Sequence, residues 1–384
     1  MNAPLRPEST AEIVEAVRAA RAGRARLVPV GAGTALTVLR PDAEGARTLD
    51  LAGLARGATD GVVEYARGDG TITLHAGARV GDVARAVRAG GHRLTPLLPA
   101  RDEAATIGGV LGAGASGPDR VALGPLRHHV LGLTFVDGTG RVARSGGRLV
   151  KNVTGFDLHR LLVGAHGTLG AVLEVSLRLF PAPEEEVLYA LETDGARSAA
   201  TIALELFGAR QPLPRYLFVR GPRVFAGLAG RRAQVERDAR ALVDRGLRRV
   251  EQGEDAAARA AADGSTPPGP VWSFGVRPSR CSSLMDALAD AGASLVDALV
   301  EPGLARVVLR ADALPDGSAV DLAAVRATGA RVLSAPPEVR VGGASTAPLF
   351  ERRLRAAFDP DGVFGVPARD VPASRARAAG SAPR

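Results

Sequence analysis

Three short glycine-rich segments, far apart in the chain, constrain the fold most. They are residues 29–34 (PVGAGT), 105–117 (ATIGGVLGAGASG) and 164–170 (GAHGTLG). Glycine lets the backbone turn tightly and approach a ligand closely, because it has no Cβ atom. Backbone N–H groups in such turns can converge on a phosphate. For each segment alone, a tight structural turn is the better explanation. The three together favour a long ligand that contains a diphosphate.

The first segment fits neither of two common nucleotide motifs. Gly31 and Gly33 follow an apolar run, but no third glycine opens a helix, as the dinucleotide-binding fingerprint requires. No Gly-Lys-Ser or Gly-Lys-Thr follows either, so the segment is not a P-loop. Thr34 adds a hydroxyl donor. We interpret the segment as a phosphate-holding turn of another type.

The N-terminal half is predicted to contain one long helix and several strands. Ser9 and Glu12 form the capping-box pattern of a helix start, and Gly23 marks the helix end. A glycine-rich loop is predicted over residues 106–117. Alternating and β-branched runs predict strands, some of them paired through glycine turns. The predicted strands are 26–30, 48–51, 62–65, 71–76, 130–136, 141–144 and 171–179, and the short helices are 82–89 and 158–163.

A domain boundary is predicted where Pro181 and Pro183 precede three glutamates. Beyond it the pattern is typical of an α+β domain with an antiparallel sheet. Its predicted strands are 187–191, 217–219, 271–276 and 305–309, and its helices lie near 196–207, 230–245, 282–291 and 319–327. The expected domains are 1–183, a cap or substrate-type domain 184–345, a segment 346–368 returning to the first domain, and a disordered tail 369–384.

One pair of rare residues is conspicuous. All but one of the 49 Lys and Arg residues are arginine, and the exception, Lys151, lies beside Asn152. Arginine is a planar fork and lysine a compact ammonium, so the two are not equivalent at a shaped site. The pair suggests a position where arginine or another residue cannot replace lysine and asparagine. The alternative is that two rare residues lie side by side by chance.

Cysteine content and charge exclude several classes of protein. The only cysteine is Cys281, which rules out an internal disulfide and an iron–sulfur cluster held by four thiolates of this chain. The net charge is +8, but the arginines are dispersed and only 4% of residues are aromatic. A nucleic-acid surface with stacking side chains is therefore not expected. No metal site is predicted.

The sequence contains no predicted membrane span, since no run approaches the roughly 18 to 20 apolar residues required. Residues 1–9 are polar and contain prolines, unlike a signal peptide. We expect a cytoplasmic protein whose association with the inner face of the cell membrane, where it occurs, is made through partners.

The order of motifs resembles the PCMH-type, vanillyl-alcohol-oxidase-like FAD-binding domain. The motifs are Pro-x-Gly-x-Gly-Thr at 29–34, Ala-Thr-Ile-Gly-Gly at 105–109, Lys-Asn-Val-x-Gly-x-Asp-Leu at 151–158 and Gly-Thr-Leu-Gly at 167–170. Residues 149–162 (LVKNVTGFDLHRLL) and 116–120 (SGPDR) are similar to the E-subunit family of glycolate oxidase in particular. The resemblance covers about residues 8–183 and is poor over 187–340.

This resemblance implies an α+β fold, in which a two-subdomain PCMH-type FAD-binding domain precedes a smaller cap domain of antiparallel sheet and helices. It implies FAD as the cofactor, and an FAD-dependent oxidoreductase that is one subunit of a larger enzyme. The diphosphate would bind at the first turn, and the third turn would pack against the nucleotide end. The implied cofactor-binding residues are Gly31, Ala32, Gly33, Thr34, Thr106, Gly108, Gly109, Ser116, Gly117, Lys151, Asn152, Gly167, Thr168, Gly170 and Val172.

Two positions within the resemblance leave alternatives open. Lys151 is expected either to place a positive charge near the flavin or a phosphate, or to form a structural ion pair with Asp157. Residues 358–364 (FDPDGVF) resemble the family's closing motif, but 365–368 (GVPA) replace its usual Asn-Pro-Gly-Arg. That departure weakens any claim for cofactor contacts from this end of the chain.

All six histidines precede residue 167. In the 2-hydroxy-acid dehydrogenases that the chain resembles, histidines of the substrate domain bind a metal and accept the hydroxyl proton. The second domain here has no histidine for either role, so we expect it not to oxidise a hydroxy acid by that route alone. His75 is interpreted as a packed strand residue, and His128 and His129 as local substitutions, with a ligand role as the alternative.

The sequence thus predicts an FAD-binding subunit of a glycolate-type 2-hydroxy-acid dehydrogenase or oxidase complex, in which the flavin relays electrons. The expected partners are a larger FAD-containing catalytic subunit and an iron–sulfur subunit, and the complex would act on a small 2-hydroxy acid. The alternatives are a non-catalytic assembly subunit with weak or no FAD, and a stand-alone FAD oxidase of another substrate. No catalytic residue is predicted.

Overall fold

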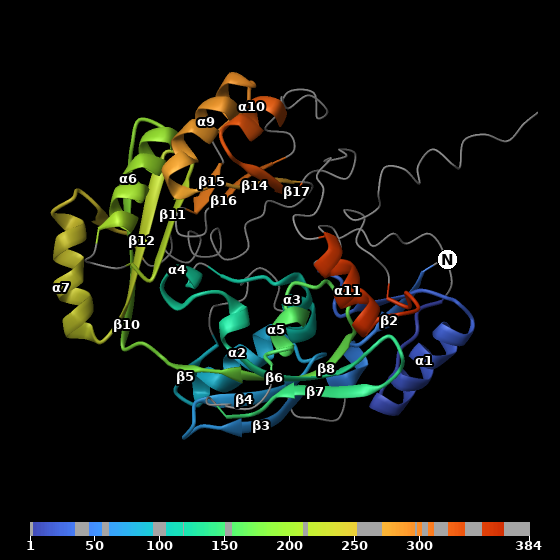
Figure 1. Ribbon diagram of the computed structural model, residues 1–384. Coiled ribbons are helices and arrows are strands. Elements are labelled where there is room, and N and C mark those ends of the chain that lie inside the picture. Colours follow the sequence, from blue (N-terminus) through green and yellow to red (C-terminus); the bar gives the residue numbers. More distant parts are fainter. Residues whose placement is uncertain are drawn as a thin grey trace, which may run out of the picture.

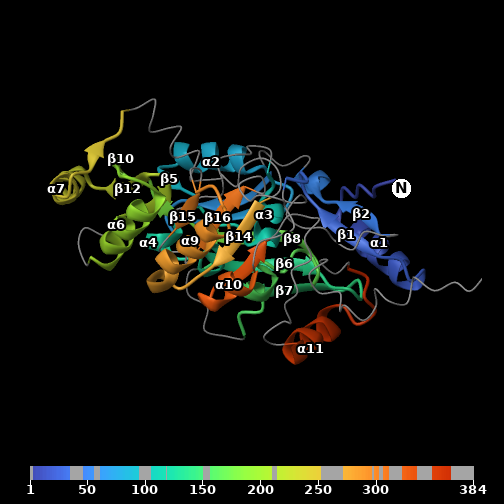
Figure 2. The same cartoon turned by 90° about the horizontal axis from the view of Figure 1, so that it is seen from above.

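The computed structural model describes residues 3–34, 46–55, 61–94, 105–117, 119–149, 156–209, 214–251, 271–295, 298–301, 306–310, 322–334 and 348–364. They form two lobes, one around a five-stranded sheet and the other around an eight-stranded sheet (Figure 1). Helix α1 (Thr10–Ala22) of the first lobe and α7 (Arg232–Val243) of the second lie at opposite ends of the molecule (Figure 2).

An antiparallel sheet in the order β3-β4-β8-β6-β7 is the base of the first lobe. Its strands are β3 (Val62–Ala66), β4 (Thr71–His75), β6 (Val130–Val136), β7 (Val142–Gly146) and β8 (Ala171–Arg178). The two predicted hairpins, β3–β4 and β6–β7, are present, and β8 pairs with β4 and β6 between them. The glycine turn before β8 therefore leads into the central strand of the sheet.

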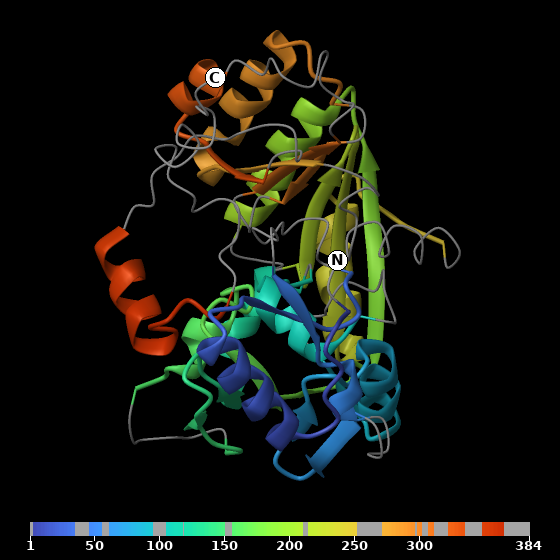
Figure 3. The same ribbon diagram turned by 90° about the vertical axis from the view of Figure 1, so that its right-hand side faces the viewer.

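Helices α2 (Val80–Ala89), α3 (Ile107–Ala113) and α5 (His159–Leu162) lie on the side of this sheet that is turned toward the second lobe (Figures 1 and 3). They share one core with the sheet, in which Leu74 of β4 and Leu111 of α3 are buried. Full burial of such a side chain contributes about 1.5–3 kcal/mol. This core holds the helix α3 rigidly on the sheet.

Helix α1 begins with the capping box that the sequence predicts. The Glu12 N–H donates to the Ser9 hydroxyl at 3.2 Å. In return, the Glu12 carboxylate accepts from the Glu8 N–H at 2.9 Å and from the Ser9 hydroxyl at 3.0 Å. The inner face of α1 packs on the parallel strands β1 (Leu27–Val30) and β2 (Arg47–Asp50) in a separate core.

The C-terminal helix α11 (Pro348–Phe358) leads into a segment that lies beside β1. The Leu27 N–H donates to the Val363 carbonyl at 2.7 Å, and Phe364 is buried in the core under α1. The Asp359 carboxylate accepts from the Val363 and Phe364 N–H groups, both at 2.8 Å. Burial raises the pKa of Asp359, although these two hydrogen bonds act in the opposite direction. The C-terminal segment thus completes the first lobe.

The second lobe is built on an antiparallel sheet in the order β13-β10-β12-β11-β15-β16-β14-β17. Its strands are β10 (Glu185–Glu192), β11 (Tyr216–Arg220), β12 (Arg223–Gly230), β13 (Arg248–Arg249), β14 (Val271–Gly275), β15 (Leu299–Glu301), β16 (Arg306–Arg310) and β17 (Arg331–Ser334). Its helices are α6 (Ala196–Gly208), α7, α9 (Cys281–Asp290) and α10 (Leu322–Ala327). Leu217 and Val219 of β11 pack with these helices, whereas Tyr216 and Phe218 form a smaller cluster on the other face.

The remaining described elements are short. They are the two-stranded sheet of β5 (His92–Arg93) and β9 (Phe180–Pro181), the helix α4 (Arg120–Leu123), and 3-10 turns at Ala52–Ala55, Leu126–His128 and Pro278–Arg280. Both β5 and the residue before α4 supply charged side chains to the interface.

A buried cluster of charged side chains joins the lobes. Asp119 is fully buried and lies 3.3 Å from the Arg93 guanidinium and 3.4 Å from that of Arg215. Arg93 also lies 2.6 Å from the Glu186 carboxylate, to which the Tyr216 hydroxyl donates. Burial raises the pKa of Asp119, and the two guanidinium groups oppose that shift. Because Arg93 and Asp119 belong to the first lobe and the other three to the second, this interlobe cluster ties the lobes together.

The predicted fold class, α+β with antiparallel sheets, is confirmed. The predicted loop over 106–117 is wrong in its first half, where residues 107–113 form α3. The domain boundary at 183 stays a prediction. It is consistent with the end of β8 at Arg178 and the start of β10 at Glu185. The predicted tail over 369–384 lies outside the described residues. Within the described part of the chain, no helix is both long enough and apolar enough to span a membrane.

Candidate functional site

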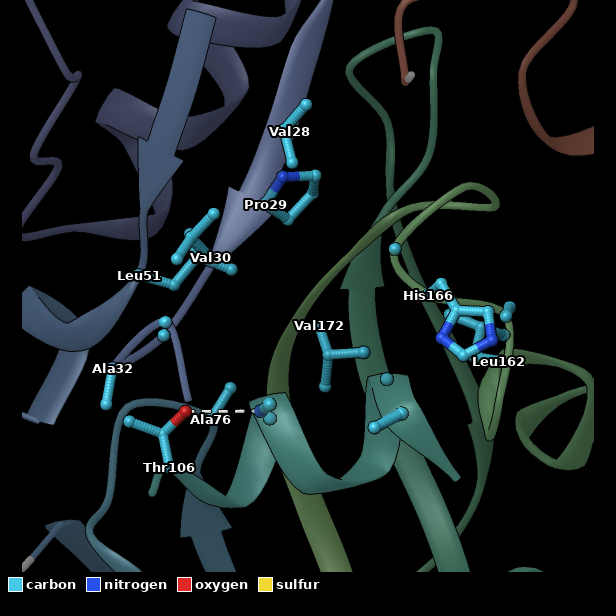
Figure 4. A pocket seen from close by; sticks show the side chains of 18 of the residues that line it. Val28, Pro29, Val30, Ala32, Leu51, Ala76, Thr106, Leu162, His166 and Val172 are labelled. Atoms are coloured by element: carbon cyan, nitrogen blue, oxygen red, sulfur yellow. Dashed lines mark hydrogen bonds between the residues drawn. The ribbon is translucent and has the colours of Figure 1, made fainter. Parts of the chain in front are cut away.

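A pocket of about 1030 Å³, counting its open mouth, lies where the three glycine-rich segments meet. Its walls come from β1 and the turn after it, from α3, and from the turn before β8 (Figure 4). The lining residues are Val28, Pro29, Val30, Gly31, Ala32, Gly33, Thr34, Leu51, Ala76, Thr106, Gly108, Gly109, Gly112, Ala113, Leu162, Ala165, His166, Gly167, Leu169, Gly170 and Val172.

The first turn lies against the start of α3. A Cβ atom on Gly31 would come within 1.9 Å of the Thr106 hydroxyl oxygen, so only glycine fits there without a shift. Gly33 has a φ of +77°, in the left-handed region that glycine adopts without strain. Thr34 is exposed at the end of the turn. The turn thus uses one glycine for close packing and the other for its backbone conformation.

Thr106 caps α3 at the edge of the pocket. Its hydroxyl oxygen accepts a hydrogen bond from the Gly109 N–H at 3.1 Å (Figure 4). An N-cap threonine contributes about 1 kcal/mol, which helps to offset the poor helix propensity of glycine. Gly108 packs on Ala76, where a Cβ atom would come within 2.8 Å of the alanine methyl group. Cap and core packing therefore explain why a helix forms here despite its glycines.

Four residues of the third turn have a positive φ angle. These are Gly164 (φ +82°), His166 (φ +54°), Gly167 (φ +74°) and Gly170 (φ +154°). A Cβ atom on Gly167 would lie 3.3 Å from the Pro29 ring, and one on Gly114 would lie 3.0 Å from the Gly164 Cα. The third turn therefore contacts both β1 and the end of α3, and the three segments enclose one space.

Ten of the predicted cofactor residues line this pocket. They are Gly31, Ala32, Gly33, Thr34, Thr106, Gly108, Gly109, Gly167, Gly170 and Val172. Lys151 and Asn152 lie outside the described residues. Asp157, the alternative partner of Lys151, lies 3.0 Å from the Arg160 guanidinium. These positions stay predictions as cofactor contacts.

Three other predicted residues are not among those that line the pocket. Ser116 accepts a hydrogen bond from the Leu126 N–H at 3.1 Å. Gly117 is buried beside it. Thr168 is buried in the third turn, where its hydroxyl donates to the Ala165 carbonyl at 2.7 Å. As cofactor contacts, these three residues stay predictions.

The sequence prediction missed His166 as a site residue, although it lies inside the third glycine turn. Figure 4 shows its ring beside Leu162, with Val172 between it and the β1 residues Pro29 and Val30. The signal in the sequence was its position between two glycines of the turn. The structure places this side chain in the lining of the pocket.

Other reactive side chains lie elsewhere. His129 and His159 are buried, and burial lowers the pKa of both rings. Among the described residues, no three His, Cys, Asp or Glu side chains gather as metal ligands. Cys281 is 1% exposed in the second lobe, and burial raises the pKa of its thiol to about 11. The thiol is therefore protonated and unreactive near neutral pH.

The first lobe and its pocket define a PCMH-type FAD-binding fold. Residues 2–146 match the family model described as FAD binding domain. The match includes the first two glycine segments and ends before the third. These residues therefore form an FAD-binding domain, and FAD is the cofactor that such a domain binds.

Several curated proteins are similar to this chain. Glycolate oxidase subunit GlcE of Escherichia coli is 34% identical over 40% of this chain and 43% of its own length. Glycolate oxidase subunit GlcD of Bacillus subtilis is 32% identical over 53% of this chain and 42% of its own length. D-2-hydroxyglutarate dehydrogenase of Xanthomonas citri is 34% identical over 48% of this chain and 38% of its own length. The matched region thus spans about two fifths of each of these relatives.

Among solved structures, alkyldihydroxyacetonephosphate synthase superposes on 94% of this chain and 77% of its own, with a TM-score of 0.65 and 15% identity. This similarity concerns the fold of both lobes. It supports the α+β architecture for the second lobe, where the sequence resemblance is poor.

The pocket fits the anionic diphosphate of FAD in shape and chemistry. Close-packed glycines line it on three sides, and Thr34 and Thr106 supply hydroxyl groups. Backbone amides and hydroxyls can hold phosphate oxygens without a large side chain in between. Gly31, Gly33 and Gly167 would hold this part of the cofactor, with Thr106 close to it.

Proposed function

We propose that this chain is the FAD-binding subunit of a 2-hydroxy-acid dehydrogenase or oxidase complex of the glycolate type. The observation that carries the proposal is the meeting of three glycine turns around one pocket in an FAD-binding domain. The relatives add that similar domains occur in subunits of glycolate oxidase and in a D-2-hydroxyglutarate dehydrogenase.

When bound, FAD supplies a two-electron acceptor for the hydride of a substrate carbon, or a relay for electrons from another centre. Oxidation of a 2-hydroxy acid to a 2-oxo acid also requires a base for the hydroxyl proton. The residues of this chain bind and orient the cofactor, but no histidine follows residue 166 to act as that base in the second lobe. A larger FAD-containing subunit would therefore carry the main catalytic site.

An iron–sulfur subunit is the second proposed partner. With Cys281 as its only cysteine, this chain cannot hold a four-thiolate cluster, so onward electron transfer needs another polypeptide. Cys281 is also buried, so its thiol is not available at the surface. The proposed function has two alternatives: an assembly subunit with weak or no FAD, and a stand-alone oxidase of another substrate.

The purified chain is expected to show the absorption bands of oxidised flavin, and dithionite should bleach them. Incubation with glycolate, D-lactate or D-2-hydroxyglutarate and a dye acceptor should give no turnover by this chain alone. Turnover should appear when the larger flavoprotein and the iron–sulfur subunit are added.

Each alternative has a distinct result in the same experiment. A chain that neither retains nor rebinds FAD would support the assembly subunit. Turnover of a 2-hydroxy acid by this chain alone would contradict the partner requirement. Flavin reduction by an unrelated substrate, with none by hydroxy acids, would support the stand-alone oxidase.

Lys151 offers a separate test of the central motif. Lys151→Arg keeps the charge and changes its shape, so a site built for an ammonium should lose FAD affinity, by about tenfold for one charged hydrogen bond. FAD affinity measured by fluorescence titration checks this. Unchanged affinity, together with lower thermal stability of Lys151→Gln, would favour the structural pair with Asp157.

A further inference from the structure

His166 is the only titratable residue in the three segments that surround the pocket. Residues 28–34, 105–117 and 162–172 contain no Asp, Glu, Lys, Arg, Cys or Tyr, and His166 is their single histidine. The other lining residues, Leu51 and Ala76, are apolar. Within the described lining, only the His166 imidazole can therefore supply a full positive charge.

The backbone of His166 is held in a conformation that is costly for a side-chain-bearing residue. Its φ of +54° lies in the left-handed region, which only two non-glycine residues adopt in the described part of the chain. Such strain persists where the surrounding structure enforces it, and it concentrates at ligand sites. Here the His166 N–H donates to the Gly112 carbonyl of α3 at 2.9 Å, which fixes the turn on the pocket wall.

Among the described residues of α5, α3, β1 and β8, the charged groups near this turn have other partners or lie farther along their elements. On α5, the His159 ring lies 3.2 Å from the Ser145 hydroxyl, and Arg160 is paired with Asp157. Helix α3 and strand β1, which pack against the turn, carry no titratable residue. On β8, the titratable residue nearest to the turn is Glu174, which lies opposite His75 in the sheet register.

We propose that His166 binds the diphosphate of FAD as an imidazolium and makes cofactor affinity depend on pH. The proposal rests on the assignment of FAD to this pocket. A counter-charge strengthens the binding of a diphosphate buried among glycines, since backbone dipoles supply only partial charges. An imidazole changes its charge between about pH 5 and pH 8, whereas lysine and arginine keep theirs. A slope in FAD affinity over this range therefore identifies the imidazole.

The test is FAD titration of the flavin-free full-length protein, followed by flavin fluorescence at several pH values from about 5 to 8. Wild type should bind FAD more tightly at low pH, and the affinity should fall by about tenfold as the imidazole loses its proton. His166→Asn should bind FAD about tenfold more weakly than wild type at low pH and show no slope. Asparagine tolerates the left-handed conformation, so the turn is preserved.

Two partial ligands locate the contact. ADP, which carries the diphosphate, should lose affinity on His166→Asn, whereas riboflavin, which lacks it, should not. Equal FAD affinity of wild type and variant at every pH would overturn the proposal, as would a loss confined to riboflavin. If wild type binds no FAD at all, the FAD site fails together with the proposal. A missing hydroxy-acid activity with normal FAD titration concerns the proposed function alone.

A matched control separates backbone strain from the imidazole. His166→Gly removes both, so the flavin-free protein should melt at the same or a higher temperature while FAD affinity falls. Arg24 is the second non-glycine residue at positive φ (+52°), and it is exposed after α1, outside the pocket lining. Arg24→Gly should relieve similar strain and leave FAD affinity unchanged. A drop in FAD affinity for Arg24→Gly would contradict a specific role of His166.

Discussion

Substitution of Gly31 by alanine is expected to abolish detectable FAD retention. The added methyl group would lie 1.9 Å from the Thr106 hydroxyl oxygen and about 3 Å from two further Thr106 atoms. The turn after β1 would then have to move away from the start of α3, on which it closes the pocket. Overpacking of this kind costs about 1–3 kcal/mol, and a displaced phosphate turn should weaken FAD binding by at least about 100-fold. Fluorescence titration and thermal unfolding measure the two effects.

A second substitution should restore part of the binding. Thr106→Ala removes the hydroxyl and methyl groups that meet the new side chain, at the loss of the α3 cap worth about 1 kcal/mol. The double variant Gly31→Ala/Thr106→Ala should therefore bind FAD better than Gly31→Ala alone. Gly68→Ala is the matched control, because no atom lies within 4 Å of its added methyl group. If the double variant loses as much FAD affinity as the two single variants together, the proposed contact between Gly31 and Thr106 is contradicted.

Removal of the Asp119 carboxylate is expected to destabilise the protein by about 3 kcal/mol. Asp119→Ala leaves the Arg215 guanidinium, 16% exposed, without its carboxylate at 3.4 Å, and leaves Arg93 with Glu186 alone. An uncompensated buried charge typically costs about 3–5 kcal/mol. Since the interlobe cluster joins both sheets, the second lobe should also become more susceptible to proteolysis. Urea unfolding and limited proteolysis test the two consequences.

The exposed pair of Glu64 and Arg148 provides the comparison for this prediction. Its side chains are 48% and 56% exposed, so Glu64→Ala should change stability by less than about 1 kcal/mol. Asp119→Asn keeps the size of the side chain, so its loss of stability should lie between those of Asp119→Ala and Glu64→Ala. If Asp119→Ala unfolds at the same urea concentration as Glu64→Ala, the cluster does not hold the lobes together.

Local patterns were sufficient to predict most of the first lobe. Both hairpins, the capping box at Ser9 and the strand over 130–136 depend on neighbouring residues, which a sequence displays directly. Helix α3 was misread because its glycines indicate a loop, while its stability comes from the Thr106 cap and from contacts with β4 residues distant in sequence. Strand β12 was missed for a related reason, since its alanines and glycines form a strand only between β10 and β11.

The candidate site could be predicted only in part. The three glycine segments were recognisable because each carries its own turn signal, and their convergence followed from the family resemblance. The proposed role of His166 could not be read from the sequence, since it depends on a left-handed backbone and on the absence of other charged side chains among the described residues that line the pocket. The interlobe cluster was equally hidden, because Arg93 and Arg215 are more than a hundred residues apart.

The hydrogen bond between Leu27 and Val363 has a consequence for biosynthesis. Strand β1 supplies Val28, Pro29 and Val30 to the pocket, but its outer neighbour is translated more than three hundred residues later. A nascent chain therefore exposes an incomplete wall until the segment that ends in Phe364 has left the ribosome. We therefore expect full FAD binding only after this segment has been translated. A truncation before Asp359 is expected to fold most of both lobes but to bind the coenzyme poorly.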